Sequence, residues 1–333
     1  MHAHLPLQTP VFFLAGALLI GSSPYALASG NCINPPVTEY PLPTPGSDPG
    51  DITLGPDDAL WFTEYFGDRI GRITTGGMIT EFALPLQSGA AGIVSGTDGA
   101  LWFAEYFGNQ IGRITTAGVI TQYAIPTASA GPIGITEGSD GALWFTEFNA
   151  GKIGRISETG SIREYPLPAS TSAPNQITAA RDGALWFAES IGDRIGRMTT
   201  AGVISEYAVP TPNGYPAGVT EGSGEALWFT ENSGRKIAKT TLRGAITEFD
   251  VPNQYGEPSY ITAGPGGAIW FTAGWNVGGV GWFTMAGAGF APTPTTASGP
   301  SGITAGPAGA GGDMWFTEQR TSWIGRVPAC AAL

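Results

Sequence analysis

The chain has 333 residues, including 51 glycines, 27 prolines and ten tryptophans, and a formal net charge of −12. This much glycine and proline is found in disordered chains, but the many aromatic residues and 42% hydrophobic residues indicate a packed core of short strands and tight turns. The negative charge argues against nucleic acid and anionic membrane surfaces as partners.

The first predicted element is an export signal over residues 1–28. Residues 11–20 form an uninterrupted apolar run that is too short to span a bilayer, and residues 26–28 (Ala-Leu-Ala) provide a cleavage site before Ser29. The leader carries no lysine or arginine, which departs from the usual pattern. We expect a secreted or periplasmic protein whose mature part, residues 29–333, has no contact with the membrane after cleavage.

The mature chain consists of seven repeats. Each repeat carries a Trp-Phe-(Thr/Ala) core, and the tryptophans follow one another at intervals of 41 to 45 residues. Self-similarity at this period is typical of the blades of a β-propeller. The seven blades are centred on Trp61, Trp102, Trp144, Trp186, Trp228, Trp270 and Trp315.

Four short β-prone runs make up each repeat, and in the first repeat they cover residues 52–54, 59–63, 69–73 and 78–82. Their β-branched and aromatic residues suit half-buried sheet surfaces, and Asp-Gly pairs such as the one at residues 98–99 are typical of tight hairpins. No segment shows the 3.6-residue period of a helix. We therefore predict an all-β protein, a closed seven-bladed propeller with four antiparallel strands per blade.

Closure is indicated by the two ends of the chain. The last repeat stops after its third run, at Val327, and the missing fourth run lies near the N-terminus, where residues 37–41 match residues 79–82. An N-terminal strand that completes the last blade is needed only in a closed ring, which leaves no exposed edges. Cys32 and Cys330 then fall on either side of one hairpin turn, so we predict a disulfide between them.

Glutamate follows the Trp-Phe-x core in six repeats, and the same six carry a basic residue on the third strand. The glutamates are Glu64, Glu105, Glu147, Glu189, Glu231 and Glu318, and the basic residues are Arg72, Arg113, Arg155, Arg197, Lys239 and Arg326. The sixth repeat has Ala273 and Trp282 at these places, so both charges are lost together. This pattern favours an ion pair within each blade over a ring of carboxylates for metal binding or acid–base chemistry.

Many catalytic sites are excluded by the residues that the mature chain lacks. Both histidines, His2 and His4, lie in the leader, so histidine-dependent nucleophilic and metal sites are excluded. The Asp-Gly pairs lack the spacing of a calcium loop, and no glycine-rich phosphate loop joins a strand to a helix. No metal site is therefore predicted from the residues.

The repeat resembles the virginiamycin B lyase (streptogramin B lyase) family over about residues 37–328. The signature is Gly-Ile-Thr-x-Gly-x-Asp-Gly-Ala-Leu-Trp-Phe-Thr-Glu followed by Ile-Gly-Arg-Ile-Thr, with clear examples at residues 134–147 and 111–126. The resemblance implies a seven-bladed propeller of a family whose lyases linearise a cyclic antibiotic lactone by elimination, with Mg²⁺ as cofactor.

The resemblance also implies where catalytic residues would lie. Two histidines of the family, each directly after a proline in the last two blades, correspond to Ser259 and Ser301, and a glutamate two residues before the second corresponds to Gly299. A serine hydroxyl does not replace imidazole as a base near pH 7. Glu257 is the remaining candidate base, and Mg²⁺ is expected only if lyase activity is retained.

We therefore predict an exported, monomeric, lyase-like propeller that acts as a binding or scaffold module for an unidentified small molecule or glycan. A lyase that uses groups other than histidine and an extracellular protein-interaction module are the alternatives. The predicted ligand surface is an aromatic arc beside Glu257, on the face where the blades begin. It comprises Tyr65, Phe66, Tyr106, Phe107, Trp275 and Trp323.

Overall fold

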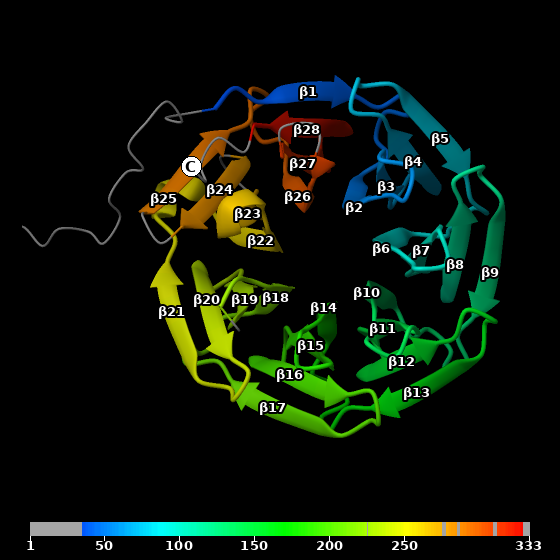
Figure 1. Cartoon of the computed structure of the whole chain (residues 1–333), viewed down its shortest axis with the longest axis vertical. Helices are drawn as coiled ribbons and strands as arrows, with labels where there is room; N and C mark the ends of the chain where they lie inside the picture. The colour runs from blue at the N-terminus through cyan, green and yellow to red at the C-terminus, as the bar shows by residue number, and fades with distance from the viewer. Residues whose placement is uncertain (1–34, 225, 275–277, 285–286, 309–311, 329–333) are drawn as a thin grey trace, which may run out of the picture.

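The computed structural model describes residues 35–224, 226–274, 278–284, 287–308 and 312–328. These residues form seven four-stranded antiparallel sheets arranged around a central axis, as Figure 1 shows. The predicted seven-bladed propeller is confirmed. The described 3₁₀ segments include η1 (Asn253–Tyr255) and η2 (Pro265–Gly267). Among the described residues, no helix has the length and apolar character needed to cross a membrane.

Six blades are built from four consecutive strands each, with the first strand nearest the axis and the fourth at the perimeter (Figure 1). Blade one contains β2 (Pro49–Leu54), β3 (Leu60–Glu64), β4 (Arg69–Ile73) and β5 (Ile79–Ala83). Blade two contains β6 (Ala90–Ser95), β7 (Ala100–Glu105), β8 (Gln110–Thr115) and β9 (Ile120–Ala124). Blade three contains β10 (Pro132–Glu137), β11 (Leu143–Glu147), β12 (Lys152–Ile156) and β13 (Ile162–Pro166). Blade four contains β14 (Pro174–Ala179), β15 (Ala184–Glu189), β16 (Arg194–Thr199) and β17 (Ile204–Ala208). Blade five contains β18 (Pro216–Glu221), β19 (Ala226–Glu231), β20 (Lys236–Thr241) and β21 (Ile246–Asp250). Blade six contains β22 (Pro258–Ala263), β23 (Ile269–Ala273), β24 (Gly279–Thr284) and β25 (Gly287–Pro292).

Blade seven combines both ends of the described chain. It contains β26 (Pro300–Ala305), β27 (Met314–Glu318), β28 (Trp323–Val327) and, outermost, the N-terminal strand β1 (Thr38–Pro41). Beyond this pairing, the Leu42 N–H donates to the Ser322 carbonyl at 2.9 Å. The Thr317 hydroxyl donates to the Gly50 carbonyl at 2.6 Å, which bonds the last blade to the first. The N-terminal strand therefore closes the ring.

Three sequence-based predictions fall outside the described residues. These are the signal peptide over residues 1–28, the disulfide between Cys32 and Cys330, and the place of Trp275 in the aromatic arc.

The core of each blade is centred on the repeat tryptophan. In blade two, Trp102 is fully buried and stacks on Tyr123 of the fourth strand, with ring centroids 5.7 Å apart. It also packs with Leu143 and Phe145 of blade three, so one apolar cluster joins two blades. In blade six a second tryptophan, Trp282, packs against the repeat tryptophan instead, with the two rings tilted by 32° and their centroids 5.0 Å apart. Burial of these large rings holds neighbouring blades together.

The predicted ion pair between glutamate and the third-strand base is wrong, because the base pairs with the aspartate of the preceding hairpin. In blade two, Arg113 Nε donates to Asp98 Oδ2 at 2.7 Å, and the Trp102 indole N–H donates to Asp98 Oδ1 at 3.3 Å. The guanidinium also lies over the indole, 5.8 Å from its centroid. The same pair recurs as Arg72–Asp57, Arg155–Asp140, Arg197–Asp182 and Arg326–Asp313.

The glutamate of the second strand is buried and faces the fourth strand instead. In blade two, Gln122 Nε2 donates to both carboxylate oxygens of Glu105 at 2.9 Å, and the Ser88 hydroxyl donates to the same carboxylate. Five other blades have glutamate at the place of Gln122, so two carboxyl groups lie close together. These pairs are Glu64–Glu81, Glu147–Glu164, Glu189–Glu206, Glu231–Glu248 and Glu318–Glu39.

The loss of charges in blade six follows these actual partners. Gly266 takes the place of the hairpin aspartate when Trp282 takes that of the arginine, and Phe290 takes the place of the fourth-strand glutamate when Ala273 takes that of the second. Two independent pairs are therefore absent from this blade. The sequence analysis considered the arginine of one pair and the second-strand glutamate of the other, and it wrongly assigned these two residues to each other.

A double-mutant cycle distinguishes the two possible partners of Arg113. We expect Asp98→Ala and Arg113→Ala to be coupled by about 1 kcal/mol in the free energy of unfolding, because they remove one charge-assisted hydrogen bond at a partly exposed site. Glu105→Ala and Arg113→Ala should be additive within about 0.5 kcal/mol. Urea unfolding measures both cycles, and strong coupling to Glu105 alone would contradict the assignment.

Candidate functional site

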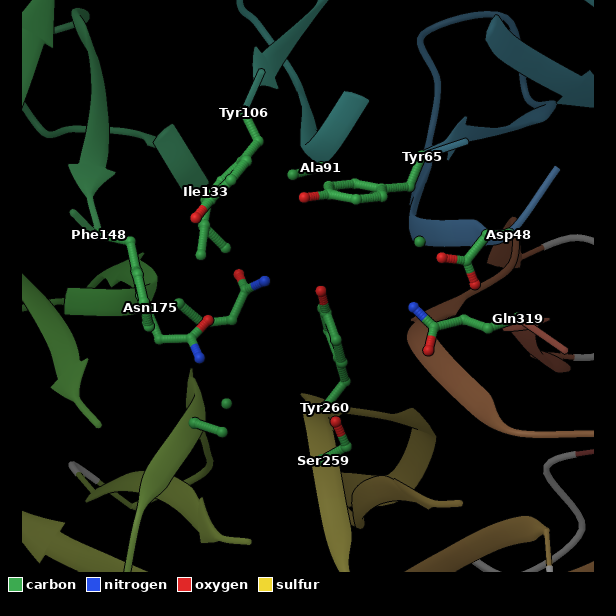
Figure 2. Close-up of a pocket in the computed structure, with 14 residues that line it drawn as sticks. Asp48, Tyr65, Ala91, Tyr106, Ile133, Phe148, Asn175, Ser259, Tyr260 and Gln319 are labelled. Atoms are coloured by element: carbon green, nitrogen blue, oxygen red, sulfur yellow. The ribbon is translucent and has the colours of Figure 1, made fainter. Parts of the chain in front are cut away.

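A cavity of about 370 Å³ lies at the mouth of the central channel, and all seven blades contribute to its lining. Pro49, at the start of β2, lies opposite Glu64, at the end of β3, so the starts of the first strands and the loops after the second strands border the same opening. Figure 2 shows the side chains that converge there. The volume lies in the lower part of the range of small-molecule sites, about 300–1,000 Å³.

Apolar side chains predominate on one side of the cavity, next to the amide of Asn175, and polar side chains lie on the other, next to the ring of Tyr65. Tyr106, Ile133 and Phe148 stand together on one side, and Asp48 and Gln319 lie side by side on the opposite side, as Figure 2 shows. No lysine, arginine or histidine lies among the described residues that line it. The cavity therefore offers aromatic faces, amides, hydroxyls and carboxylates, but no positive charge.

The third residue of each first strand determines how far the channel is filled. It is glycine in four blades, where a Cβ would come within 2.3–2.7 Å of backbone atoms of the next blade. In the other three blades a polar side chain projects from this place. The four glycines are Gly92, Gly134, Gly218 and Gly302, and the three exceptions are Asp51, Gln176 and Tyr260.

Tyr260 and Gln176 bring two polar groups together inside the cavity. The Tyr260 hydroxyl reaches the middle of the cavity in Figure 2 and faces the side chains of Gln176 and Ser301. Burial, together with the nearby carboxylate of Asp51, raises the pKa of this phenol, so it stays protonated. The Nε2 of Gln176 is buried and makes no hydrogen bond shorter than 3.5 Å to another described residue, although the Tyr260 hydroxyl faces it.

Asp51 lies close to Tyr260 on the wall of the channel. Its carboxylate accepts the backbone N–H of Ile52 at 2.9 Å and that of Ile93 in the next blade at 3.2 Å. Burial outweighs these hydrogen bonds and raises the pKa of Asp51 to about 7. Near neutral pH this carboxyl group is therefore divided between its charged and neutral forms.

The three positions that correspond to the family's catalytic residues, and the candidate base Glu257, lie in different places relative to the cavity. Ser259 lines the cavity, and Ser301 is buried against the Tyr260 hydroxyl. Gly299 has a φ of +66°, a conformation in which any other L-residue is strained. Glu257 does not line the cavity, and its carboxylate lies 3.6 Å from the guanidinium of Arg235.

The predicted aromatic arc is partly assembled. Tyr65, Phe66, Tyr106 and Phe107 form one cluster, in which the rings of Tyr65 and Phe107 are 5.2 Å apart. Phe66 and Phe107 are exposed and line a second, outer groove of about 640 Å³, and Tyr65 lines both this groove and the central cavity. Trp323, opposite Glu318 on β28, lines neither.

The residues at the three family positions do not fit a magnesium site. No group of three or more histidine, cysteine, aspartate and glutamate side chains is placed to hold a metal ion in the described part of the chain. Serine and glycine at the three family positions supply no carboxylate or imidazole. We therefore derive no reaction step through Mg²⁺.

Sequence reasoning missed most of the residues that line the cavity, including Asn175, Gln176, Tyr260 and Gln319. A signal for two of them was present in the repeat. Aligning the third residue of each first strand shows glycine in four repeats and a larger side chain in three, and those departures point into the channel. Gln319 has no such signal, because the residue after the second-strand glutamate follows no common pattern among the blades.

The fold and the cavity define a seven-bladed propeller with a polar and aromatic chamber on its axis. The virginiamycin B lyase family model matches residues 32–189 and 170–332, and the chain belongs to this family. It is 38% identical to virginiamycin B lyase from Staphylococcus aureus, covering 88% of this chain and 99% of that one with a TM-score of 0.82. A catalytically inactive histidine-to-alanine variant of the same enzyme, solved with quinupristin, matches with the same values. A gluconolactonase from Xanthomonas campestris, 19% identical over 87% of this chain and 98% of that one with a TM-score of 0.57, shares the fold.

Proposed function

We propose that this protein is a ligand-binding member of the family that uses the mouth of the central channel and does not open cyclic lactones. The observation that carries the proposal is the composition of the cavity. Ser259 and Ser301 stand where the lyases have histidines, while aromatic and amide side chains line a chamber large enough for a small molecule.

The inactive Staphylococcus aureus variant supports a separation of binding from catalysis. In that protein, a histidine has been replaced by alanine, the enzyme is catalytically inactive, and the structure still contains quinupristin. Loss of a catalytic imidazole is therefore compatible with ligand binding in this fold. By analogy, a chain without either histidine can keep a binding function.

The alternative of a lyase that uses other groups has little support from the geometry. Glu257, the candidate base, is paired with Arg235 and lies outside the cavity lining. Asp51 has a pKa of about 7, which suits a general base, but both its carboxylate oxygens accept backbone N–H groups. A protein-interaction role has its best candidate surface in the outer groove, where Phe66 and Phe107 are exposed.

We propose that the protein is exported from the cytoplasm and acts as a monomer. Export is supported by the apolar run of residues 11–20, which is followed by a small-residue cleavage site before Ser29. N-terminal sequencing of the protein recovered from the medium or periplasm should begin at Ser29. Recovery of the intact leader in the cytoplasm would contradict this location.

Incubation with quinupristin and Mg²⁺ tests the absence of lyase activity. We expect no linear product from the purified mature chain, because no imidazole is available to take the proton that elimination releases. Reverse-phase chromatography separates the cyclic and linear forms, and the Staphylococcus aureus lyase serves as the positive control. A Mg²⁺-dependent linear product that disappears with Glu257→Gln would overturn this prediction and establish the alternative.

A further inference from the structure

We propose that the inner polar group, defined as Gln176 and Tyr260 of the cavity lining together with Ser301 behind the Tyr260 hydroxyl, recognises the hydroxyl groups of a neutral sugar. This inference rests on the proposed binding function and adds the chemical class of the ligand. It begins from the unsatisfied donor of Gln176 and from the side chains that surround it.

A ligand hydroxyl can form the hydrogen bonds that the polar side chains of the cavity need. The buried Nε2 of Gln176 needs an acceptor, and the carboxylate of Asp48 on the polar wall accepts hydrogen bonds. A hydroxyl group donates one hydrogen bond and accepts two, so adjacent hydroxyls can serve both needs at once. Asn175 and Gln319 add amides, which both donate and accept.

The charge of the lining distinguishes this ligand from ionic ones. An anion would find no lysine, arginine or histidine among the described residues of the lining, and it would meet the carboxylate of Asp48. A cation would suit Asp48, but it has no acceptor for the buried donor of Gln176. A neutral ligand with hydroxyl groups meets both conditions.

The apolar wall supplies the second element of sugar recognition. Tyr106 and Phe148 stand on this wall, and the Tyr106 hydroxyl is held by Asn149 Oδ1 at 3.1 Å. A sugar ring has an apolar face of C–H groups and an edge of hydroxyls, so it can lie against these rings while its edge faces the polar wall. The two opposed walls in Figure 2 match this two-sided chemistry.

The position of the inner polar group is also unusual within the repeat. Gln176 and Tyr260 occupy the strand position that is glycine in four blades because the next backbone is so close. Side chains at this position therefore require local space between blades. The structural repeat does not need them, since most blades close the ring without them.

Titration of the mature chain with a defined sugar panel tests the inference. The panel is glucose, galactose, mannose, N-acetylglucosamine, xylose and cellobiose, with saturation-transfer NMR to detect binding and calorimetry to measure affinity. We expect at least one sugar to bind and Gln176→Leu to weaken it by about tenfold, because the variant removes a buried hydrogen bond of about 1.4 kcal/mol. Tyr260→Phe should weaken the same sugar and serves as the second variant if Gln176→Leu does not fold.

Gln110→Leu is the matched control. It makes the same chemical change on β8, at a place where other blades carry arginine, lysine, glycine or tryptophan, and it should leave the affinity unchanged. Binding of a sugar that neither cavity variant weakens would overturn the inference. Binding of quinupristin without any panel sugar would overturn the inference and leave the proposed function intact. If the protein bound neither the sugars nor quinupristin, both proposals would fail.

Discussion

Raising the pH from about 5 to about 9 should lower the stability of this protein steeply, because five blades each place a buried carboxyl group beside a second, partly buried one. In each pair, burial and the adjacent carboxylate raise the pKa of the second-strand glutamate to about 7 or about 8. In four of these pairs the carboxyl group of the fourth-strand partner accepts hydrogen bonds from the linker that leads into its own blade. For example, the Thr44 N–H and hydroxyl donate to Glu81 at 3.1 and 2.7 Å.

The sign of the effect follows from proton binding. In the unfolded chain these glutamates titrate near their ordinary value of about 4.4, whereas the folded protein keeps their protons up to about pH 7 to 8. Their contribution to stability is therefore complete below the unfolded pKa and is lost as the pH rises through the folded pKa. Each carboxyl group contributes up to about 1.4 kcal/mol per pH unit across that interval.

Two reciprocal substitutions isolate this contribution from the general effect of net charge. Glu147→Gln keeps the shape of the protonated side chain without the need for a proton, so it should stabilise the protein by about 1 kcal/mol or more at pH 9 and have little effect at pH 5. Gln122→Glu creates a sixth carboxyl pair in blade two and should act in the opposite direction. Urea unfolding followed by tryptophan fluorescence measures both. Parallel pH profiles for the parent and both variants would contradict the account.

Removal of the N-terminal strand should have the second large effect. A chain that begins at Thr44 lacks β1, and with it the stack of Tyr40 on Trp315 and the hydrogen bonds that Glu39 accepts from Thr295. We expect the melting temperature to fall by roughly 10 °C or more. The bare edge of β28 should also promote association, because an unpaired edge strand is a template for pairing with another chain.

A chain that begins at Pro35 is the matched control for this truncation. It also lacks Cys32, so the predicted disulfide does not distinguish the two chains, but it retains all of β1. Calorimetry and size-exclusion chromatography should show a stable monomer for this control. Equal melting temperatures for the two chains would mean that β1 is not needed to close the ring.

The fold was predictable from the sequence because the repeat specifies it seven times. The interval between tryptophans and the glycine-rich hairpins set the blades, and the match between residues 37–41 and 79–82 placed the closing strand. Strand boundaries were less well predicted, since β2 begins at Pro49 and the first predicted run began at residue 52. The extra residues cover a bulge next to the channel, which a simple alternating pattern does not reveal.

Side-chain partners were predicted poorly because the spacing of residues does not show which face of a strand they share. Glu105 and Arg113 lie on adjacent strands, but Glu105 lies opposite Gln110 and Arg113 opposite Trp102. The arginine therefore reaches Asp98 at the lower hairpin, and the glutamate reaches the fourth strand. The joint loss of the glutamate and the arginine in blade six suggested that the two residues were linked, but it did not show which residues each of them contacts.

Part of the predicted ligand surface lies at the cavity, and its role in binding stays a prediction. Tyr65 and Tyr106 were expected on this rim and do line the cavity, whereas the predicted base, Glu257, lies outside it. The repeat marks Gln176 and Tyr260 as departures from glycine, but it does not show that their side chains meet, because that depends on contacts between blades that are far apart in sequence. A ring brings the first strands of all blades to one axis, and only the assembled structure shows which of them meet.

The most direct test of the central claim is the crystal structure of the mature protein soaked with the sugar that binds most tightly. The account predicts density for one sugar in the mouth of the channel, with its apolar face against Tyr106 and Phe148 and a hydroxyl within hydrogen-bonding distance of Gln176 Nε2. Density confined to the outer groove of Phe66 and Phe107, with the central cavity holding only solvent, would contradict it.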